Sequence, residues 1–323
     1  MPARSNRRAV QVLLAALLAL AAGCRPSGPA APARDGAAKG RPLVGVSLLT
    51  MANPFFKDMA DAMRAEADRQ GFDLSVTAGE NDAARQRDQV NDFIVKRASA
   101  IVLCPCDSRA VGTAISAANQ AGVPVFTADI ASLDPLAKVV CHVATDNHDG
   151  GKLAGKAMIQ ALGGKGTVAI VDHPEVESVL LRTRGFREAL AGAPGIRVVA
   201  QLPGGGVRDV AFKTAQDILE KHPDLAGIFA INDPTALGAV AAIEKAGRTG
   251  KVKVIGFDGM PEAKQAIKEG RIWADAVQYP DRIGITVIQS VAKYMAGEKV
   301  PSRVLIPTGL YMQEDARQDP ALR

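Results

Sequence analysis

The regular alternation of two kinds of segment from Leu43 onward constrains the fold of this chain more than any other feature. Short runs rich in β-branched residues predict strands over Leu43–Leu49, Asp73–Thr77, Ala100–Cys104, Pro124–Thr127, Val139–Thr145, Gly166–Val171, Ile196–Gln201, Gly227–Ala230, Val252–Gly256 and Ile272–Val277. Amphipathic stretches between most of them predict helices over Pro54–Gln70, Asp82–Arg97, Ser108–Ala121, Gly150–Leu162, Glu175–Ala191, Val207–Lys221, Pro234–Ala246 and Asp281–Met295. This alternation is typical of parallel sheets with helices on both faces.

The number of predicted strands favours two sheets over one, because about ten strands divide more commonly into two sheets of about five. The break is expected near Val139–Asp146. Only the loop Ile130–Lys138, and no helix, separates the strand there from the one before it. The sequence therefore predicts an α/β protein of two doubly wound lobes that face each other across a cleft.

The N-terminus has the pattern of an export signal. Three arginines precede an apolar stretch over 9–22, and the small residues Ala21-Ala22-Gly23 lead directly to Cys24. This pattern resembles a bacterial lipoprotein signal, which implies that residues 1–23 are removed and that Cys24 is lipidated. An ordinary secretory signal that happens to precede a cysteine is the alternative. Residues 24–42 are rich in Pro, Ala and Gly and predict a flexible, lipid-anchored tether, with the folded part in the periplasm or at the exterior of the cell envelope.

The net charge of +5 belongs to this N-terminal part. Residues 1–23 hold three arginines and no acid, and residues 24–42 hold four basic residues and one acid, so the rest of the chain is close to neutral. Nucleic-acid binding needs a basic patch on the fold itself, so the composition gives it no support. A hydrophobic content of 47% excludes a wholly disordered chain.

Polar side chains gather where the predicted strands end, which is where ligands bind in doubly wound sheets. They include Asn53, Asp107, Asp129, Asp172, Arg182, Asn232, Asp258 and Gln278. Carboxylates accept two hydroxyl hydrogen bonds, and amides donate and accept at once. One of Phe55 and Phe56 is expected to face the cleft, where an aromatic ring can stack on a sugar; packing of both rings in the core is the alternative. The set suits a small neutral polyhydroxylated ligand, although each polar residue alone is also an ordinary helix cap.

Ordered motifs along the chain carry a family resemblance. They are Asn53-Pro54-Phe55-Phe56, Asp107-Ser108, Asn119-Gln120-Ala121, Asp129, Asp146-Asn147 with Gly150-Gly151-Lys152, Gly185-Phe186, Asn232-Asp233, Gly256-Phe257-Asp258-Gly259, and Gln278 with Pro280-Asp281. From about Leu43 to Tyr311, their order and spacing resemble the ribose-binding type of periplasmic substrate-binding protein, which serves bacterial ABC transporters.

The resemblance implies a type I periplasmic binding protein: two Rossmann-like lobes with parallel sheets, joined by a three-segment hinge. A sugar or polyol would bind between the lobes, and the closed complex would be presented to the membrane permease. The crossovers are expected near Thr145-Asp146, Gln278-Tyr279 and Pro307-Thr308. The N-terminal lobe would then be 43–145 plus 279–307, and the C-terminal lobe 146–278 plus 308–323. By position, the resemblance implies ligand contacts at Asn53, Phe55, Phe56, Asp129, Arg182, Asn232, Phe257, Asp258 and Gln278.

Three positions depart from the family pattern. Cys104 stands where the ribose binders have Asn, Ile130 where they have Arg, and Gly206 where they have Phe. Cys104 is therefore a further expected ligand contact, but a thiol is only a weak donor and an isoleucine offers none. Ribose is expected to bind poorly, and a ligand with an apolar or missing group at this point is expected to bind better.

Other classes of function fit the sequence less well. A dinucleotide-binding enzyme needs G-x-G-x-x-G after a strand, whereas Thr50-Met51-Ala52-Asn53 follows the first one. The four histidines show no zinc-ligand spacing, and His173 with Glu175 and Glu177 is better explained as a cleft-edge loop than as a metal site. A regulator related to the lactose repressor would need a helix-turn-helix in the place of the export signal. We expect a monomer without catalysis, cofactor or metal, which touches a membrane only through its lipid anchor. The alternative is a ligand-binding protein that signals to a membrane receptor. An exported α/β enzyme is a further alternative that fits the sequence less well.

The cysteines leave two alternatives open. Lipidation of Cys24 would leave Cys104, Cys106 and Cys141. Cys104-Pro105-Cys106 is too close and too stiff for an easy mutual disulfide. A bridge from either one to Cys141 is the alternative to three free, mostly buried thiols, which we expect.

Overall fold

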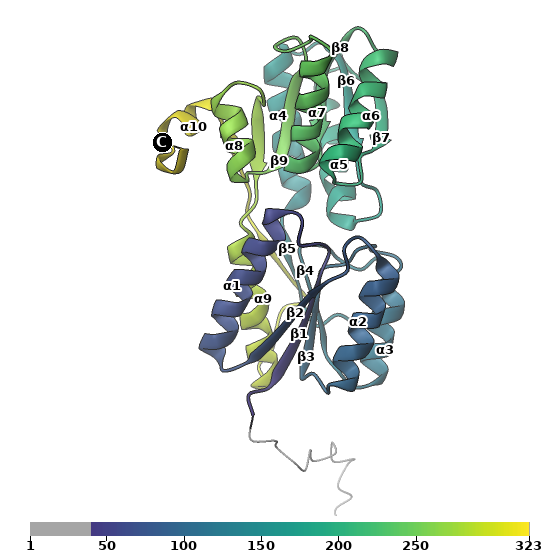
Figure 1. The fold of residues 1–323 in the computed structure, drawn as a ribbon, viewed down its shortest axis with the longest axis vertical. Helices are drawn as coiled ribbons and strands as arrows, with labels where there is room; N and C mark the ends of the chain where they lie inside the picture. Colours follow the sequence, from purple (N-terminus) through teal and green to yellow (C-terminus); the bar gives the residue numbers. More distant parts are fainter. Residues whose placement is uncertain (1–39, 323) are drawn as a thin grey trace, which may run out of the picture. The chain divides into compact units, whose positions relative to one another are not determined.

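The computed structural model describes residues 40–322, so the expected export signal, Cys24 and most of the tether lie outside the described residues. Two six-stranded sheets form the framework of residues 41–322 (Figure 1). The strands of the first sheet, in spatial order, are β11 (Arg303–Ile306), β5 (His142–Thr145), β4 (Val125–Ala128), β3 (Ala100–Leu103), β1 (Leu43–Leu48) and β2 (Asp73–Ala78). All neighbours in this sheet are parallel.

The second sheet repeats this plan with one exception. Its strands, in spatial order, are β12 (Gly309–Met312), β10 (Ala274–Val277), β9 (Lys253–Asp258), β8 (Leu225–Ala230), β6 (Gly166–Asp172) and β7 (Ile196–Pro203). The edge strand β12 runs antiparallel to β10, and the other neighbours are parallel. The prediction of an α/β protein with two parallel-sheet lobes is confirmed.

Helices cover both faces of each sheet, as the alternation predicts (Figure 1). The first sheet carries α1 (Pro54–Gln70) with α9 (Pro280–Met295) on one face, and α2 (Ala83–Val95) with α3 (Gly112–Gln120) on the other. The second sheet carries α4 (Asn147–Leu162) with α5 (Glu177–Leu190), and α6 (Arg208–Lys221) with α7 (Asp233–Lys245). The C-terminal part adds α8 (Pro261–Lys268), α10 (Gln313–Gln318) and a 3-10 turn over Pro320–Leu322.

The first helix shows how local sequence sets these boundaries. Asn53 caps it by accepting a hydrogen bond from the N–H of Phe55, and Pro54 occupies its first turn. Gly71 ends it in a left-handed conformation with φ of 76°. The predicted range of Pro54–Gln70 is therefore confirmed, and the start of the helix is fixed next to the carboxyl end of β1.

The chain passes between the two sheets three times. It crosses after β5, before α4 packs against β9 and β10, and again after β10, before α9 packs against α1. The third crossing lies between β11 and β12. The lobes are therefore joined by three connections. How the connections move and where each lobe begins and ends as a rigid unit stay predictions.

Two strands and two helices were not predicted. The strands β11 and β12 have four residues each and flank the third crossing at Pro307-Thr308. No helix lies between them, so the alternation that indicates the other strands is missing. The helix α8 has eight residues and begins at a proline directly after the β9 turn, and α10 has six. Each sheet therefore has six strands instead of about five.

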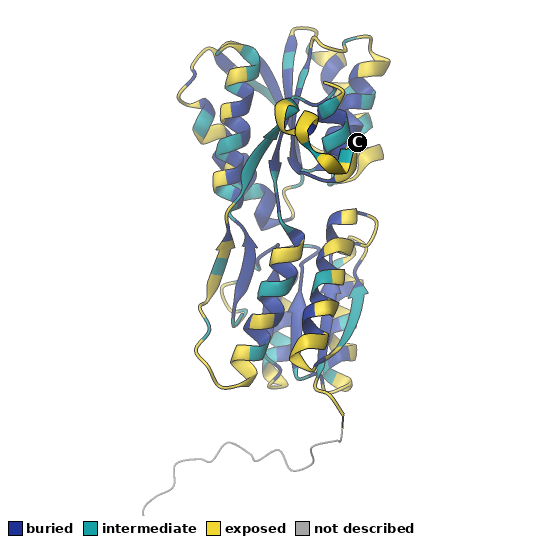
Figure 2. Cartoon of the chain, turned by 90° about the vertical axis from the view of Figure 1, so that its left-hand side faces the viewer, coloured by how far each residue is buried: buried dark blue, intermediate teal, exposed yellow. Residues whose placement is uncertain are grey.

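The burial pattern follows the layers (Figure 2). Strands β3, β4 and β5 are buried at every position, as predicted for strands covered on both faces. Helices expose one side and bury the other, as amphipathic sequences dictate. Among the helices of residues 40–322, none has the length and apolarity that a membrane crossing requires.

Candidate ligand-binding site

A cavity of about 560 Å³ lies at the carboxyl ends of the strands, lined by both lobes. This volume is typical of sites for small molecules. The start of α1 and the loop after β4 line it from the first lobe, and the starts of α5 and α7 line it from the second. This cavity therefore lies at the strand ends, where the sequence predicts the site.

Most of the expected ligand contacts line this cavity. They are Asn53, Phe55, Phe56, Asp129, Arg182, Asn232, Asp258 and Gln278. Ile130 and Gly206, two of the departures from the family pattern, also line it. Cys104 and Phe257 do not line it: both are fully buried behind the wall. Whether the lining residues touch a ligand stays a prediction.

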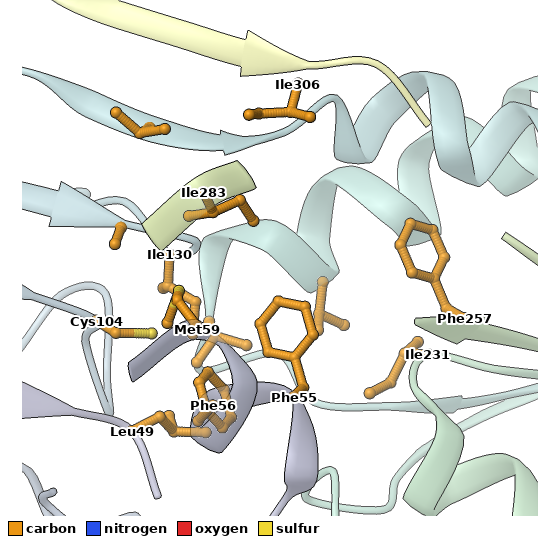
Figure 3. Close-up of a cluster of buried hydrophobic side chains, with 14 of the residues drawn as sticks. Leu49, Phe55, Phe56, Met59, Cys104, Ile130, Ile231, Phe257, Ile283 and Ile306 are labelled. Atoms are coloured by element: carbon orange, nitrogen blue, oxygen red, sulfur yellow. The ribbon is translucent and has the colours of Figure 1, made fainter. Parts of the chain in front are cut away.

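Both phenylalanines at the start of α1 line the cavity, where the helix pattern alone indicated one and the family resemblance implied both. Their rings meet edge to face with centroids 5.2 Å apart. Phe56 lies beside Leu49 and Met59 of the first lobe, whereas Phe55 extends towards Ile231 of the second (Figure 3). They are 1% and 5% exposed, so packing and lining are combined in the same residues.

Arg182 is the central charged group of the second lobe. Its guanidinium donates to the carbonyl of Ile231 at 2.7 Å and to Asn147 Oδ1 at 2.8 Å, and it lies 3.4 Å from Asp258 Oδ1. The guanidinium also covers the Phe257 ring, 3.9 Å from its centroid. Phe257 therefore supports Arg182 from behind instead of facing the cavity, which explains why its ring does not line it.

Glycines bring the backbone of Arg182 close to α4. A Cβ added at Gly151 would lie 2.1 Å from the Arg182 carbonyl oxygen, and one added at Gly185 would lie 2.1 Å from the His148 carbonyl oxygen. The two helices can therefore cross at this distance only with glycine at both positions. The Gly150-Gly151 motif, which contributed to the resemblance, thus allows the close helix crossing that positions Arg182.

The two carboxylates of the cavity are held in unusual backbone conformations. Asp129 has a backbone φ of 64° and Asp258 one of 122°, values that residues other than glycine rarely adopt. Such strain persists where the surrounding structure fixes it, and it gathers at functional sites. Gln278 Nε2 donates to Asp258 Oδ1 at 2.7 Å, whereas Asp129 Oδ1 is buried and accepts from no donor within residues 40–322. Asp129 therefore has an oxygen available to a ligand.

Burial dominates the electrostatics of both carboxylates. It raises the pKa of Asp129 to about 7, against the opposing attraction of Arg182 and with added repulsion from Asp258. It raises the pKa of Asp258 to about 6, although Arg182 and the hydrogen bond from Gln278 favour the charged form. A neutral ligand that donates hydroxyl hydrogen bonds would restore the solvation that both groups lack.

The asparagines serve both as helix caps and as cavity walls. Asn53 Oδ1 accepts from the N–H of Phe55 at 3.0 Å, and Asn232 Oδ1 accepts from the N–H of Thr235 at 3.0 Å. Asn232 Nδ2 donates to the Gly206 carbonyl at 3.2 Å. The capping role and the expected ligand role are therefore compatible, because each amide group keeps N–H donor capacity.

The cysteines of the described chain are buried and form no disulfide among themselves, as the favoured prediction had it. The Cys104 thiol donates to Asp129 Oδ2, with sulfur and oxygen 3.9 Å apart. Burial raises the pKa of this thiol well above its ordinary value. Cys104 therefore lies behind Asp129. Having Cys instead of Asn at this position changes what contacts the Asp129 carboxylate, and it does not change the cavity wall.

Sequence reasoning missed the apolar part of the wall and the contact between the lobes. Leu49, Val176, Val179, Leu237 and Met260 line the cavity. They follow strands or begin helices in the same way as the polar candidates, so their position in the pattern could have indicated them. The direct hydrogen bonds between the loop after β3 and the start of α5 have no comparable signal in the sequence.

Those hydrogen bonds join the two lobes at Ser108. Its N–H donates to the Glu175 carbonyl at 2.9 Å, and its Oγ accepts from the N–H of Glu177 at 2.8 Å. The residue that precedes α5, Val176, makes no side-chain cap of its own. A serine of one lobe thus caps a helix of the other.

Comparison with known proteins identifies the family. Residues 44–299 match the model of the periplasmic binding protein domain. The chain is 34% identical over 272 residues to the ribose import binding protein of Escherichia coli (strain K12), covering 84% of this chain and 90% of that protein. It is 30% identical over 284 residues to the D-apiose import binding protein of Paraburkholderia graminis, covering 87% and 90%.

Solved structures agree with these relatives. An ABC transporter periplasmic solute binding protein from Actinobacillus succinogenes 130z with bound D-allose is 30% identical with a TM-score of 0.80, covering 86% of this chain and 100% of that one. A solute binding protein from Bacillus halodurans C-125 with bound myo-inositol is 27% identical with a TM-score of 0.81, covering 88% and 98%. The chain therefore belongs to the periplasmic binding protein family, in its ribose-binding type.

Proposed function

We propose that this protein captures a small neutral sugar or polyol between its lobes, outside the cytoplasm, and delivers it to the permease of an ABC transporter. The observation that carries the proposal is the cavity between the lobes, with Asp129 on one side and Arg182, Asp258 and Gln278 on the other. These groups can accept and donate to several hydroxyls at once. Phe55 and Phe56 add aromatic faces against which the C–H side of a sugar ring can pack.

The relatives support the same class of ligand. They are named for the import of ribose and of D-apiose, and solved neighbours hold D-allose and myo-inositol. The family consists of binding proteins, and the expected role of this chain is binding without catalysis. The monomeric state and the recognition of a permease are parts of the same proposal.

Specificity is expected to depend on Ile130 more than on Cys104. Ile130 is 2% exposed and lines the cavity next to Asp129, whereas Cys104 lies behind that carboxylate. A ligand hydroxyl placed against Ile130 would lose its water without gaining a partner, which costs about 1–3 kcal/mol. The preferred ligand should therefore present a C–H or missing group at this point, and ribose should bind poorly.

The proposal includes anchoring and motion. Residues 1–23 would be removed as a signal, and Cys24 would carry the lipid. The segments 43–145 plus 279–307 and 146–278 plus 308–323 would move as two lobes about the three connections. Ligand binding would then favour the closed arrangement, as in other hinged proteins.

Thermal unfolding in the presence of single compounds tests the proposed class of ligand. D-allose, D-apiose, D-ribose, myo-inositol and glycerol form the panel, with amino acids as controls. A ligand present at 100 times its Kd adds about 2.7 kcal/mol of stability, so a matching sugar or polyol should raise Tm clearly. Stabilisation by a different class of metabolite, with none from any carbohydrate, would contradict the proposal.

A further inference from the structure

The turn that carries Asp258 is held by two other carboxylates, Asp233, which also lines the cavity, and Asp275, which does not. The strand β9 ends at Asp258, and Gly259 and Met260 lead into α8. The N–H of Gly259 donates to Asp275 Oδ2 at 3.1 Å, and the N–H of Met260 donates to Asp233 Oδ2 at 2.6 Å. Two successive amides of the turn are thus bound by acids from α7 and β10.

The same two acids are buried and lie close together, because their Oδ2 atoms accept from two successive amides of one turn. Asp233 is 2% exposed and Asp275 is 0% exposed. Their Oδ1 atoms are also buried, and neither accepts from any donor among the described residues. Two carboxylates can form a hydrogen bond only when one of them is protonated.

The backbone leaves room for this pair. A Cβ added at Gly256 would lie 2.8 Å from Asp275 Oδ1 and 3.3 Å from the Cβ of Ala236. Strand β9 therefore passes close to the acids only because Gly256 has no side chain. The arrangement depends on the sequence of three elements, β9, β10 and α7.

The charged groups around the pair favour retention of a proton. Asp258 repels both acids, and Arg182, which contacts Asp258, is the cation that acts on Asp275. Two titratable groups of the neighbouring elements are paired with other residues. Glu262 of α8 forms an ion pair with Arg208, and Tyr311 of β12, which lies opposite Asp275, donates to Asp319. Burial, followed by repulsion from its neighbours, raises the pKa of Asp233 well above its ordinary value. Burial raises the pKa of Asp275 to about 7.

We propose that Asp233 and Asp275 share one proton and act together as positioning residues, which hold the Gly259–Met260 turn so that Asp258 faces the ligand. The assignment rests on the proposed function, because Asp258 is taken to bind the ligand. Loss of the proton would leave two buried negative charges close together on one turn, and their repulsion would displace it. Ligand affinity should therefore fall at alkaline pH.

The first test needs no ligand. Carboxyl carbon NMR of the full mature chain should show, at pH 7, one proton held by the Asp233–Asp275 pair, released only above neutral pH. In Asp275→Asn the amide can donate to Asp233 and still accept from Gly259, so the N–H resonances of Gly259 and Met260 should keep their positions up to higher pH. Ionisation of both acids at pH 7 in the unaltered protein would overturn the proposal.

The second test measures affinity for the panel compound that stabilises the protein most, between pH 6 and pH 9. The unaltered protein should lose affinity by up to about tenfold per pH unit once the shared proton leaves. Asp275→Asn should match it at pH 6 and lose less affinity at pH 9. Asp217→Asn, at an exposed position of α6, is the matched control and should follow the unaltered protein. Equal pH dependence in all three proteins would overturn the positioning role.

The two tests separate this proposal from the proposed function. If no panel compound binds but the NMR test finds the shared proton, the ligand class is wrong and the acid pair stands. If Asp275→Asn does not fold, Asp233→Asn replaces it, because the amide can then donate to Asp275. A carbohydrate that binds with the same affinity from pH 6 to pH 9 would leave the proposed function intact and contradict the positioning role.

Discussion

Ser108 Oγ accepts a hydrogen bond from the N–H of Glu177 at 2.8 Å, across the boundary between the two sheets. Ser108 follows β3 of the first sheet, and Glu177 is the first residue of α5, which packs in the second lobe. Because α5 also carries Arg182, this contact connects the arrangement of the lobes with the main cation of the cavity.

Replacement of Ser108 by alanine should weaken ligand binding without unfolding either lobe. Loss of a cap costs about 0.5–2 kcal/mol, and here the cost falls on the arrangement in which the lobes meet. The Kd should therefore rise about two- to thirtyfold. Titration with the bound sugar measures the change, and Ser302→Ala, at an exposed position, is the control. An unchanged Kd in Ser108→Ala would show that the contact does not favour the bound arrangement.

Asp258→Asn should reduce affinity while keeping the shape of the site. The substitution removes the charge that pairs with Arg182 and accepts from Gln278. Hydrogen bonds to a charged group contribute about 1.5–3 kcal/mol, so affinity should fall about ten- to a hundredfold. Circular dichroism checks that the fold is intact. Binding as tight as that of the unaltered protein would exclude Asp258 from the ligand contacts.

The raised pKa of Asp129, about 7, predicts a pH dependence of stability in the ligand-free protein. The unfolded chain releases this proton near the ordinary value, so the folded state holds more protons between the two pKa values. The contribution of Asp129 is thus fully present below the unfolded pKa and is lost as pH rises through about 7.

Denaturant unfolding at several pH values measures this effect. Over that window the unaltered protein should lose up to about 1.4 kcal/mol per pH unit relative to Asp129→Asn. Taking the difference between the two proteins cancels the titration of the remaining acids. Parallel stability curves would mean that Asp129 titrates normally in the folded state.

Substitution at Ile130 should change specificity, and substitution at Cys104 should change it less. Ile130 lines the cavity, whereas the Cys104 thiol reaches only Asp129. Ile130→Arg supplies donors beside Asp129 and should raise affinity for D-ribose relative to that for the preferred ligand. Competition binding measures the ratio, with Cys104→Ala as the matched comparison. Tight binding of D-ribose by the unaltered protein would show that Ile130 does not face a ligand hydroxyl.

The sequence predicts the framework well because period and capping are local properties. The bounds of α1 follow from Asn53, Pro54 and Gly71, which act within one or two turns of the helix. The strands β11 and β12 could not be predicted in the same way, because they are short and are fixed by pairing with β5 and β10. Local patterns carry no information on such distant partners.

In the candidate site, too, local features could be predicted from the sequence and distant contacts could not. Strand-end position correctly brought Asn53, Asp129 and Asp258 to one cavity, since parallel strands end at a common edge. It could not distinguish Phe257, covered by the Arg182 guanidinium, from residues that line the wall. That distinction depends on which side of β9 each side chain points to and on what packs there.

Calorimetric titration of the panel sugar that stabilises the protein most tests the central claim, that a carbohydrate binds between the lobes. The account predicts one saturable site per chain in the unaltered protein. It also predicts a large loss of affinity in the double variant Asp129→Asn with Asp258→Asn, which changes one carboxylate on each side of the cavity. Carbohydrate binding of undiminished affinity in the folded double variant, or no saturable binding of any carbohydrate by the unaltered protein, would contradict it.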